Sequence, residues 1–79
     1  MYPNYRIDIA RKTVTHTETG VILSFVECRD GGWIDYIATD SIFKTYQLTT
    51  DQLYAITSRA KAAWANAHYL AKQSLEVIR

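Results

Sequence analysis

The chain lacks the residues from which small domains usually build internal cross-links. Its 79 residues include a single cysteine, Cys28, which excludes an internal disulfide and fits a reducing compartment. The two histidines, His16 and His68, lie too far from Cys28 in sequence to match a zinc-ligand spacing. A chain this short buries only ~60% of its unfolded surface, so its stability would benefit from an oligomer or a partner. We expect no metal and no cofactor.

Other absences exclude broad classes of function. No apolar run approaches the ~20 residues of a membrane span, and the first residues lack the basic-then-apolar pattern of a signal peptide. We therefore expect a soluble cytoplasmic protein that binds no membrane. The formal net charge is +1, with both signs scattered along the chain, which argues against a strongly basic nucleic-acid binder and against an acidic mimic of nucleic acid.

Candidate catalytic groups are sparse as well. Cys28, beside Arg29 and Asp30, is the one nucleophile with charged neighbours, and neither histidine has a spacing that implies contact with it. We interpret Cys28 as a half-buried strand cysteine. Asp35 and Asp40 would need a pocket to act as an acid–base pair, and a sheet of this size offers little room for one. We expect no catalytic residue and no enzymatic activity.

The strongest positive signal is a long amphipathic helix over residues 49–78. Thr49 and Gln52 form a capping-box pattern, and Asp51 places a negative charge in the first turn, where the helix dipole stabilises it. No glycine or proline follows. Small or apolar residues recur at steps of three and four, namely Leu53, Ile56, Ala60, Ala63, Ala67, Leu70, Ser74 and Val77. The alanines in this stripe predict either a sheet-facing surface or the seam of a helix–helix dimer.

The predicted helix is longer than any strand in the chain. At ~1.5 Å per residue it spans about 45 Å, whereas a strand of eight residues covers only ~27 Å. We therefore expect the end of the helix to extend beyond the sheet, with Leu70, Leu75, Val77 and Ile78 in need of cover.

The residues before the helix predict a small antiparallel sheet. Residues 5–9 alternate as a half-buried strand, residues 11–12 break the pattern as a bulge or a turn, and residues 13–17 can continue the strand. Residues 21–28 are apolar on nearly both faces, as in a central strand, and residues 33–38 form the return strand.

Residues 43–48 predict either a short fourth strand or an extended lead into the helix. The fold class is therefore α+β, with a three- or four-stranded antiparallel sheet and one long carboxy-terminal helix packed on one face. The length predicts a single domain over residues 1–79.

The turn after the central strand assigns the two faces of the sheet. A two-residue loop at Asp30 and Gly31 would pair Cys28 with Trp33. The face under the helix then carries Val21, Leu23, Phe25, Ile34, Tyr36 and Ala38, and we expect Phe25, Tyr36 and Trp64 in the core. The other face carries Ile22, Ser24, Val26, Cys28, Trp33, Asp35 and Ile37. A longer loop would exchange the faces of one strand, because the side-chain period is two.

The second face is the candidate binding site, because one helix can cover only one side of a sheet. We predict protein-binding residues there, namely Trp33, Ile37, Val26, Ile22, Asp35 and Arg29. The partner is another protein or a second copy in a homodimer. The alternative is cover by residues 13–17 or by the amino terminus.

The expected function is that of a small non-enzymatic protein-binding or regulatory module. Inhibitors and accessory subunits of larger complexes, such as phage-encoded anti-defence proteins, are proteins of this kind. One alternative is a nucleic-acid-binding protein that stacks bases on Trp33 beside Arg6, Arg11 and Arg29. Another is a homodimer with a purely structural role.

Overall fold

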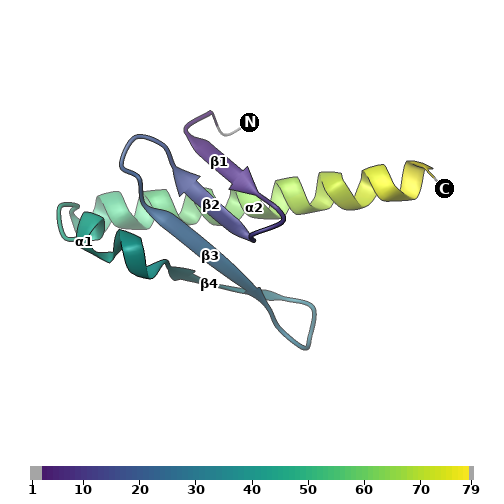
Figure 1. Ribbon diagram of the computed structural model, residues 1–79, viewed down its shortest axis with the longest axis horizontal. Helices are drawn as coiled ribbons and strands as arrows, with labels where there is room; N and C mark the ends of the chain where they lie inside the picture. The colour runs from purple at the N-terminus through teal and green to yellow at the C-terminus, as the bar shows by residue number, and fades with distance from the viewer. Residues whose placement is uncertain (1–2, 79) are drawn as a thin grey trace.

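The computed structural model shows a four-stranded antiparallel sheet with one long helix across one face, which confirms the predicted α+β class (Figure 1). It describes the backbone of residues 3–78 and the side chains of residues 3–71. The strands lie in chain order and are β1 (Tyr5–Asp8), β2 (Thr13–His16), β3 (Ile22–Glu27) and β4 (Trp33–Ile37). A 3₁₀ helix, η1 (Thr39–Ser41), and a one-turn helix, α1 (Ile42–Thr45), lead to α2 (Thr50–Ile78).

The threonine-rich segment forms a separate strand and does not continue the first one. The chain reverses between β1 and β2, where Lys12 adopts a φ of 58° and its amide donates to the Ile9 carbonyl oxygen at 3.3 Å. The Arg11 amide donates to Asp8 Oδ1 at 3.0 Å and closes the same turn. Of the two predictions for residues 11–12, the turn is correct, and residues 13–16 supply the fourth strand.

Both predictions for residues 43–48, a short strand and an extended lead into the helix, are wrong, because the chain leaves the sheet in helical turns. Ser41 is fully buried where these turns begin. Its hydroxyl proton is shared between the carbonyl oxygens of Ala38 at 2.9 Å and Ile22 at 3.2 Å. This contact holds η1 against the start of β3, and α1 follows η1 directly.

The β3–β4 hairpin has a three-residue loop where the sequence predicted two residues. The Cys28 amide donates to the Gly32 carbonyl oxygen at 2.7 Å, and the Gly31 amide donates to the Cys28 carbonyl oxygen at 3.0 Å. Gly31 has a φ of +88°, the left-handed conformation that such a loop requires at its last residue. Trp33 consequently pairs with Glu27 and not with Cys28.

This register exchanges the two faces of β4 relative to the prediction. Trp33, Asp35 and Ile37 lie on the helix-facing side, and Ile34 and Tyr36 lie on the opposite side. The expected core position of Tyr36 is therefore wrong, while those of Phe25 and Trp64 are confirmed. The core cluster consists of Val14, Val21, Leu23, Phe25, Ala60 and Trp64.

The beginning of α2 is fixed by the predicted capping box. The Gln52 amide donates to Thr49 Oγ1 at 3.1 Å, and the Thr49 amide donates to Gln52 Oε1 at 2.9 Å. The helix lies mainly over β1 and β2. Its Ala60 and Ala63 are buried, which confirms the sheet-facing prediction for this part of the alanine stripe.

The carboxy-terminal end of α2 extends past the sheet, as its length predicted (Figure 1). Leu70, in the last third of α2, is exposed. The side chains of Leu75, Val77 and Ile78, which were predicted to need cover, lie outside the described residues.

Candidate functional site

The candidate site is the face of the sheet that points away from α2, which we call the open face. Within the described residues, no helix or loop lies over it. The strands present there Arg6, Asp8, Thr13, Thr15, Ile22, Ser24, Val26, Ile34 and Tyr36. The alternative that residues 13–17 cover this face is wrong, because residues 13–16 form β2 within the sheet.

One half of the open face is apolar. Val26 and Ile34 lie directly opposite each other on β3 and β4, and Tyr36 follows on β4 opposite Ser24. The exposed fractions of Val26, Ile34 and Tyr36 are 48%, 59% and 53%. An isolated hairpin could not hold these side chains in place, but here β3 is also paired with β2. The sheet therefore presents a preformed apolar surface to solvent.

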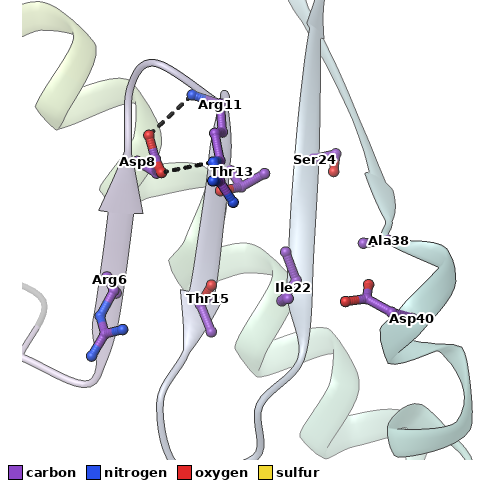
Figure 2. Close-up of a pocket in the computed structure, with 9 residues that line it drawn as sticks. All are labelled: Arg6, Asp8, Arg11, Thr13, Thr15, Ile22, Ser24, Ala38 and Asp40. Atoms are coloured by element: carbon purple, nitrogen blue, oxygen red, sulfur yellow. Dashed lines mark hydrogen bonds and ion pairs between the residues drawn. The ribbon is translucent and has the colours of Figure 1, made fainter.

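The other half contains a shallow polar groove of about 310 Å³ (Figure 2). Its lining residues are Arg6, Asp8, Arg11, Thr13, Thr15, Ile22, Ser24, Ala38 and Asp40. Figure 2 shows the hydroxyl groups of Thr13, Thr15 and Ser24 along the middle of the groove, with charged side chains at its borders.

The charges of the groove are separated across the sheet. Arg6 lies on β1, and Asp40 lies just after β4 at the opposite border (Figure 2). The pairing places Arg6, Thr15, Ile22 and Ala38 in one row across the four strands. Within the described part of the chain, neither Arg6 nor Asp40 forms an ion pair.

The other two charged residues of the groove, Asp8 and Arg11, are paired with each other. The Arg11 guanidinium Nε lies 3.8 Å from Asp8 Oδ2, in addition to the backbone bond from Arg11 to the same carboxylate. Both side chains are well exposed, so this ion pair contributes only ~0–1 kcal/mol to stability. The two charges that remain available for a partner are those of Arg6 and Asp40.

The groove supplies hydrogen-bonding and charged groups. Its lining contains neither histidine nor cysteine. Among the described residues, no group of three or more histidine, cysteine, aspartate or glutamate side chains is arranged to hold a metal ion. Cys28 lies half-buried directly after β3, outside the groove.

The predicted binding residues divide between the two sides of the sheet. Ile22 and Val26 lie on the open face as predicted, and Arg29 lies exposed in the β3–β4 loop. The placement of Trp33, Ile37 and Asp35 on the uncovered face is wrong, because the three-residue loop turns them toward the side of α2.

The contacts of Trp33 and Asp35 with α2 follow from this placement. The Trp33 ring meets the edge of Trp64 at a centroid distance of 5.3 Å and contacts the His68 ring at 5.2 Å. Asp35 Oδ1 lies 3.2 Å from Lys61 Nζ. Both residues hold β4 to α2, so neither contributes its side chain to the open face.

Sequence reasoning missed two sets of exposed side chains. Ile34 and Tyr36 lie on the open face in place of Trp33 and Ile37. The signal in the sequence was the possibility of a longer loop, which exchanges the two faces of the strand that follows it. Phe43 and Tyr46 are each 79% exposed around α1, and the strand prediction for this segment obscured their helical spacing.

Comparison with known proteins adds no further assignment. No family model, no curated protein and no solved structure matches the chain. Within the described residues, no helix combines the length and hydropathy that a bilayer span requires.

Proposed function

We propose that the protein is a non-enzymatic protein-binding module that acts through the open face of its sheet. The observation that carries the proposal is the half-exposed apolar surface of Val26, Ile34 and Tyr36, held on a hydrogen-bonded sheet beside a charged groove. Protein interfaces typically combine such an apolar centre with a polar rim. Tyrosine is also among the residues that most often contribute strongly to binding free energy.

The total exposed area supports the proposal. A compact monomer of 9.1 kDa exposes about 4,900 Å² by the usual scaling with mass, whereas this chain exposes 6032 Å². The excess of about 1,100 Å² is comparable to the ~800 Å² that each partner buries in a standard protein–protein interface. The exposed side chains of Val26, Ile34 and Tyr36 on the open face contribute to it.

In this proposal the protein is a regulatory component, such as an inhibitor or an accessory subunit of a larger complex, a class that includes viral anti-defence proteins. A small rigid sheet favours such a role because little ordering accompanies binding. The free thiol of Cys28 is consistent with the cytoplasmic location that we propose.

Nucleic-acid binding is the weaker candidate for the same face. Trp33, the residue that would stack bases, packs against α2, so Tyr36 is left as the aromatic ring beside the groove. Asp8 and Asp40 lie among the groove-lining residues and offset the positive charge of the arginines.

A pull-down with the tagged protein tests the proposal when it is run with and without nuclease. The face variant combines Val26→Lys with Ile34→Glu, because opposite charges at directly paired positions preserve the hairpin while removing the apolar surface. The control variant, Tyr54→Glu, changes a side chain on α2 that is 74% exposed, more than either residue of the face variant. Circular dichroism confirms that all three proteins are folded.

The expected result is a stoichiometric protein partner, or the chain itself, that survives nuclease and is lost from the face variant but kept by the control. Nuclease-sensitive recovery would support the nucleic-acid candidate. Recovery that is unaffected by the face variant would show that binding occurs on another surface.

A further inference from the structure

We propose that the occupant of the open face is a second copy of this chain, stacked face to face about a twofold axis that runs along the strands. This inference rests on the proposed function and names the partner of the same site.

The open face has opposite charges at its two borders. The row that begins at Arg6 continues through Thr15 and Ile22 to Ala38, three strand spacings or about 14 Å away, and Asp40 follows Ala38 by two residues at that border. Within the described residues both charges lack an ion-pair partner, although both remain accessible. A ligand that matches this row must carry the same two charges in the reverse order.

A second copy provides that reversed order by symmetry. Two sheets pack about 10 Å apart with their strands aligned to within about 30°. A twofold axis along the strands places β1 over β4 of the second copy, so Arg6 faces Asp40 of the second copy and the reciprocal pair forms as well. In the next row, the Tyr36 hydroxyl can then donate to Asp8 of the second copy, and Thr13 faces Ser24.

The other aligned arrangement does not bring the two border charges together. A twofold axis perpendicular to the strands places β1 over β1 of the second copy. Arg6 would then lie at the same border as Arg6 of the second copy, and Asp40 would lie at the opposite border with Asp40 of the second copy. The pairing of Arg6 with Asp40 therefore requires the axis along the strands.

Association through the β4 edge of the sheet is disfavoured. The central residue of β4 is Asp35, and its carboxylate is paired with Lys61 on the α2 side. Antiparallel pairing of two β4 strands about their centre would place the two Asp35 residues opposite each other. An inward-pointing charge on an edge strand is a common obstacle to edge-to-edge pairing.

Sedimentation equilibrium tests the inference over about 1–500 µM, a range that covers the affinities expected of a small interface. The variants are Arg6→Asp, Asp40→Arg and the double variant that exchanges both charges. Arg59→Asp is the matched control, because it makes the same charge change on an exposed residue of α2. Melting curves show whether each variant is folded.

The wild-type chain is expected to dimerise. Each single reversal converts two attractive pairs into two repulsive pairs, so the dissociation constant should rise about 10- to 50-fold. The double variant should return to within about threefold of the wild type, because exchanging both charges restores both pairs. The Arg59→Asp control should leave the dissociation constant unchanged.

Two outcomes would overturn the inference. A chain that stays monomeric throughout the concentration range would exclude a second copy as the occupant. It would leave the proposed binding of another protein to be decided by the pull-down with the Val26→Lys and Ile34→Glu variant. A dimer whose dissociation constant responds to neither charge reversal would place the dimer interface on another surface.

Discussion

The replacement of Trp64 by alanine tests the packing on which the whole arrangement depends. The Trp64 side chain is 2% exposed, and its ring stacks on Phe25 at a centroid distance of 4.8 Å with an interplanar angle of 7°. Removing a buried tryptophan side chain costs about 3–5 kcal/mol of unfolding free energy. A domain of 79 residues has a total of roughly 4–12 kcal/mol, so the variant should lose a large share of its stability.

One feature of the site places the expected loss toward the lower end of that range. Trp64 Nε1 is buried and has no hydrogen-bond partner among the described residues. An unsatisfied buried donor already costs the wild-type protein about 1–3 kcal/mol, and the alanine variant no longer carries that cost. A Trp64→Phe variant keeps an aromatic ring against Phe25 and also removes the donor, so we expect it to lose no more than about 1.5 kcal/mol.

Urea denaturation followed by far-ultraviolet circular dichroism measures these differences without relying on tryptophan fluorescence. The dependence of the unfolding free energy on urea should be unchanged, and the midpoint should fall. A loss below about 1 kcal/mol for Trp64→Ala would refute the core position of the ring. A loss for Trp64→Phe as large as that for alanine would refute the claim that the indole donor is unsatisfied.

Three further predictions concern the capping box, β4 and the edge of the core. Thr49→Ala should cost about 1 kcal/mol in urea denaturation, and Thr49→Ser should retain most of the wild-type stability; equal stability of all three proteins would contradict the role of the cap. Trp33→Ala should lower the melting temperature, because its ring packs on Trp64, while leaving open-face binding intact; lost binding without lost stability would return Trp33 to the binding surface. The Tyr5 hydroxyl donates to the Ile56 carbonyl oxygen at 3.4 Å, and burial raises the pKa of Tyr5 above its usual value of 10.0. Because folding favours the neutral form of Tyr5, its contribution to the unfolding free energy is complete below pH 10.0 and is lost as the pH rises through the folded-state pKa. Tyr5→Phe should therefore reduce the loss of stability at alkaline pH, and an unchanged profile of stability against pH would contradict this role of Tyr5.

The features that depend on neighbouring residues were predictable from the sequence. The Thr49–Gln52 capping box spans three residues, and its two hydrogen bonds form as the pattern indicated. The stripe that buries Ile56, Ala60 and Ala63 follows from helical periodicity alone. The α+β class required only the order of these signals along the chain.

The face of β4 was not predictable from the same local signals. Asp30 and Gly31 occur in both two-residue and three-residue hairpin loops, and one added residue exchanges every side chain of the strand. The packing of Trp33 against Trp64 distinguishes the three-residue loop from the two-residue loop, and these two residues lie far apart in the sequence. Of the open-face residues, Ile22 and Val26 were therefore predicted from the sequence, whereas Ile34 and Tyr36 were identified only in the structure.

The strand predicted over residues 43–48 failed for a related reason. The two aromatic residues and the threonine of this segment favour a strand when the segment is considered alone. The buried hydroxyl of Ser41 binds the carbonyl oxygens of Ala38 and Ile22, which starts helical turns at the end of the sheet. Long-range hydrogen bonds of this kind leave no periodic trace in the sequence.

The part of α2 that extends past the sheet gives the molecule a built-in spacer. Each residue added to or removed from this segment would shift whatever lies beyond it by about 1.5 Å and rotate it by about 100° around the helix axis. A reporter domain joined in helical continuity would therefore be presented at a distance and an angle set by residue count. A series of single-residue insertions after Leu70 would move such a domain around the helix without disturbing the open face.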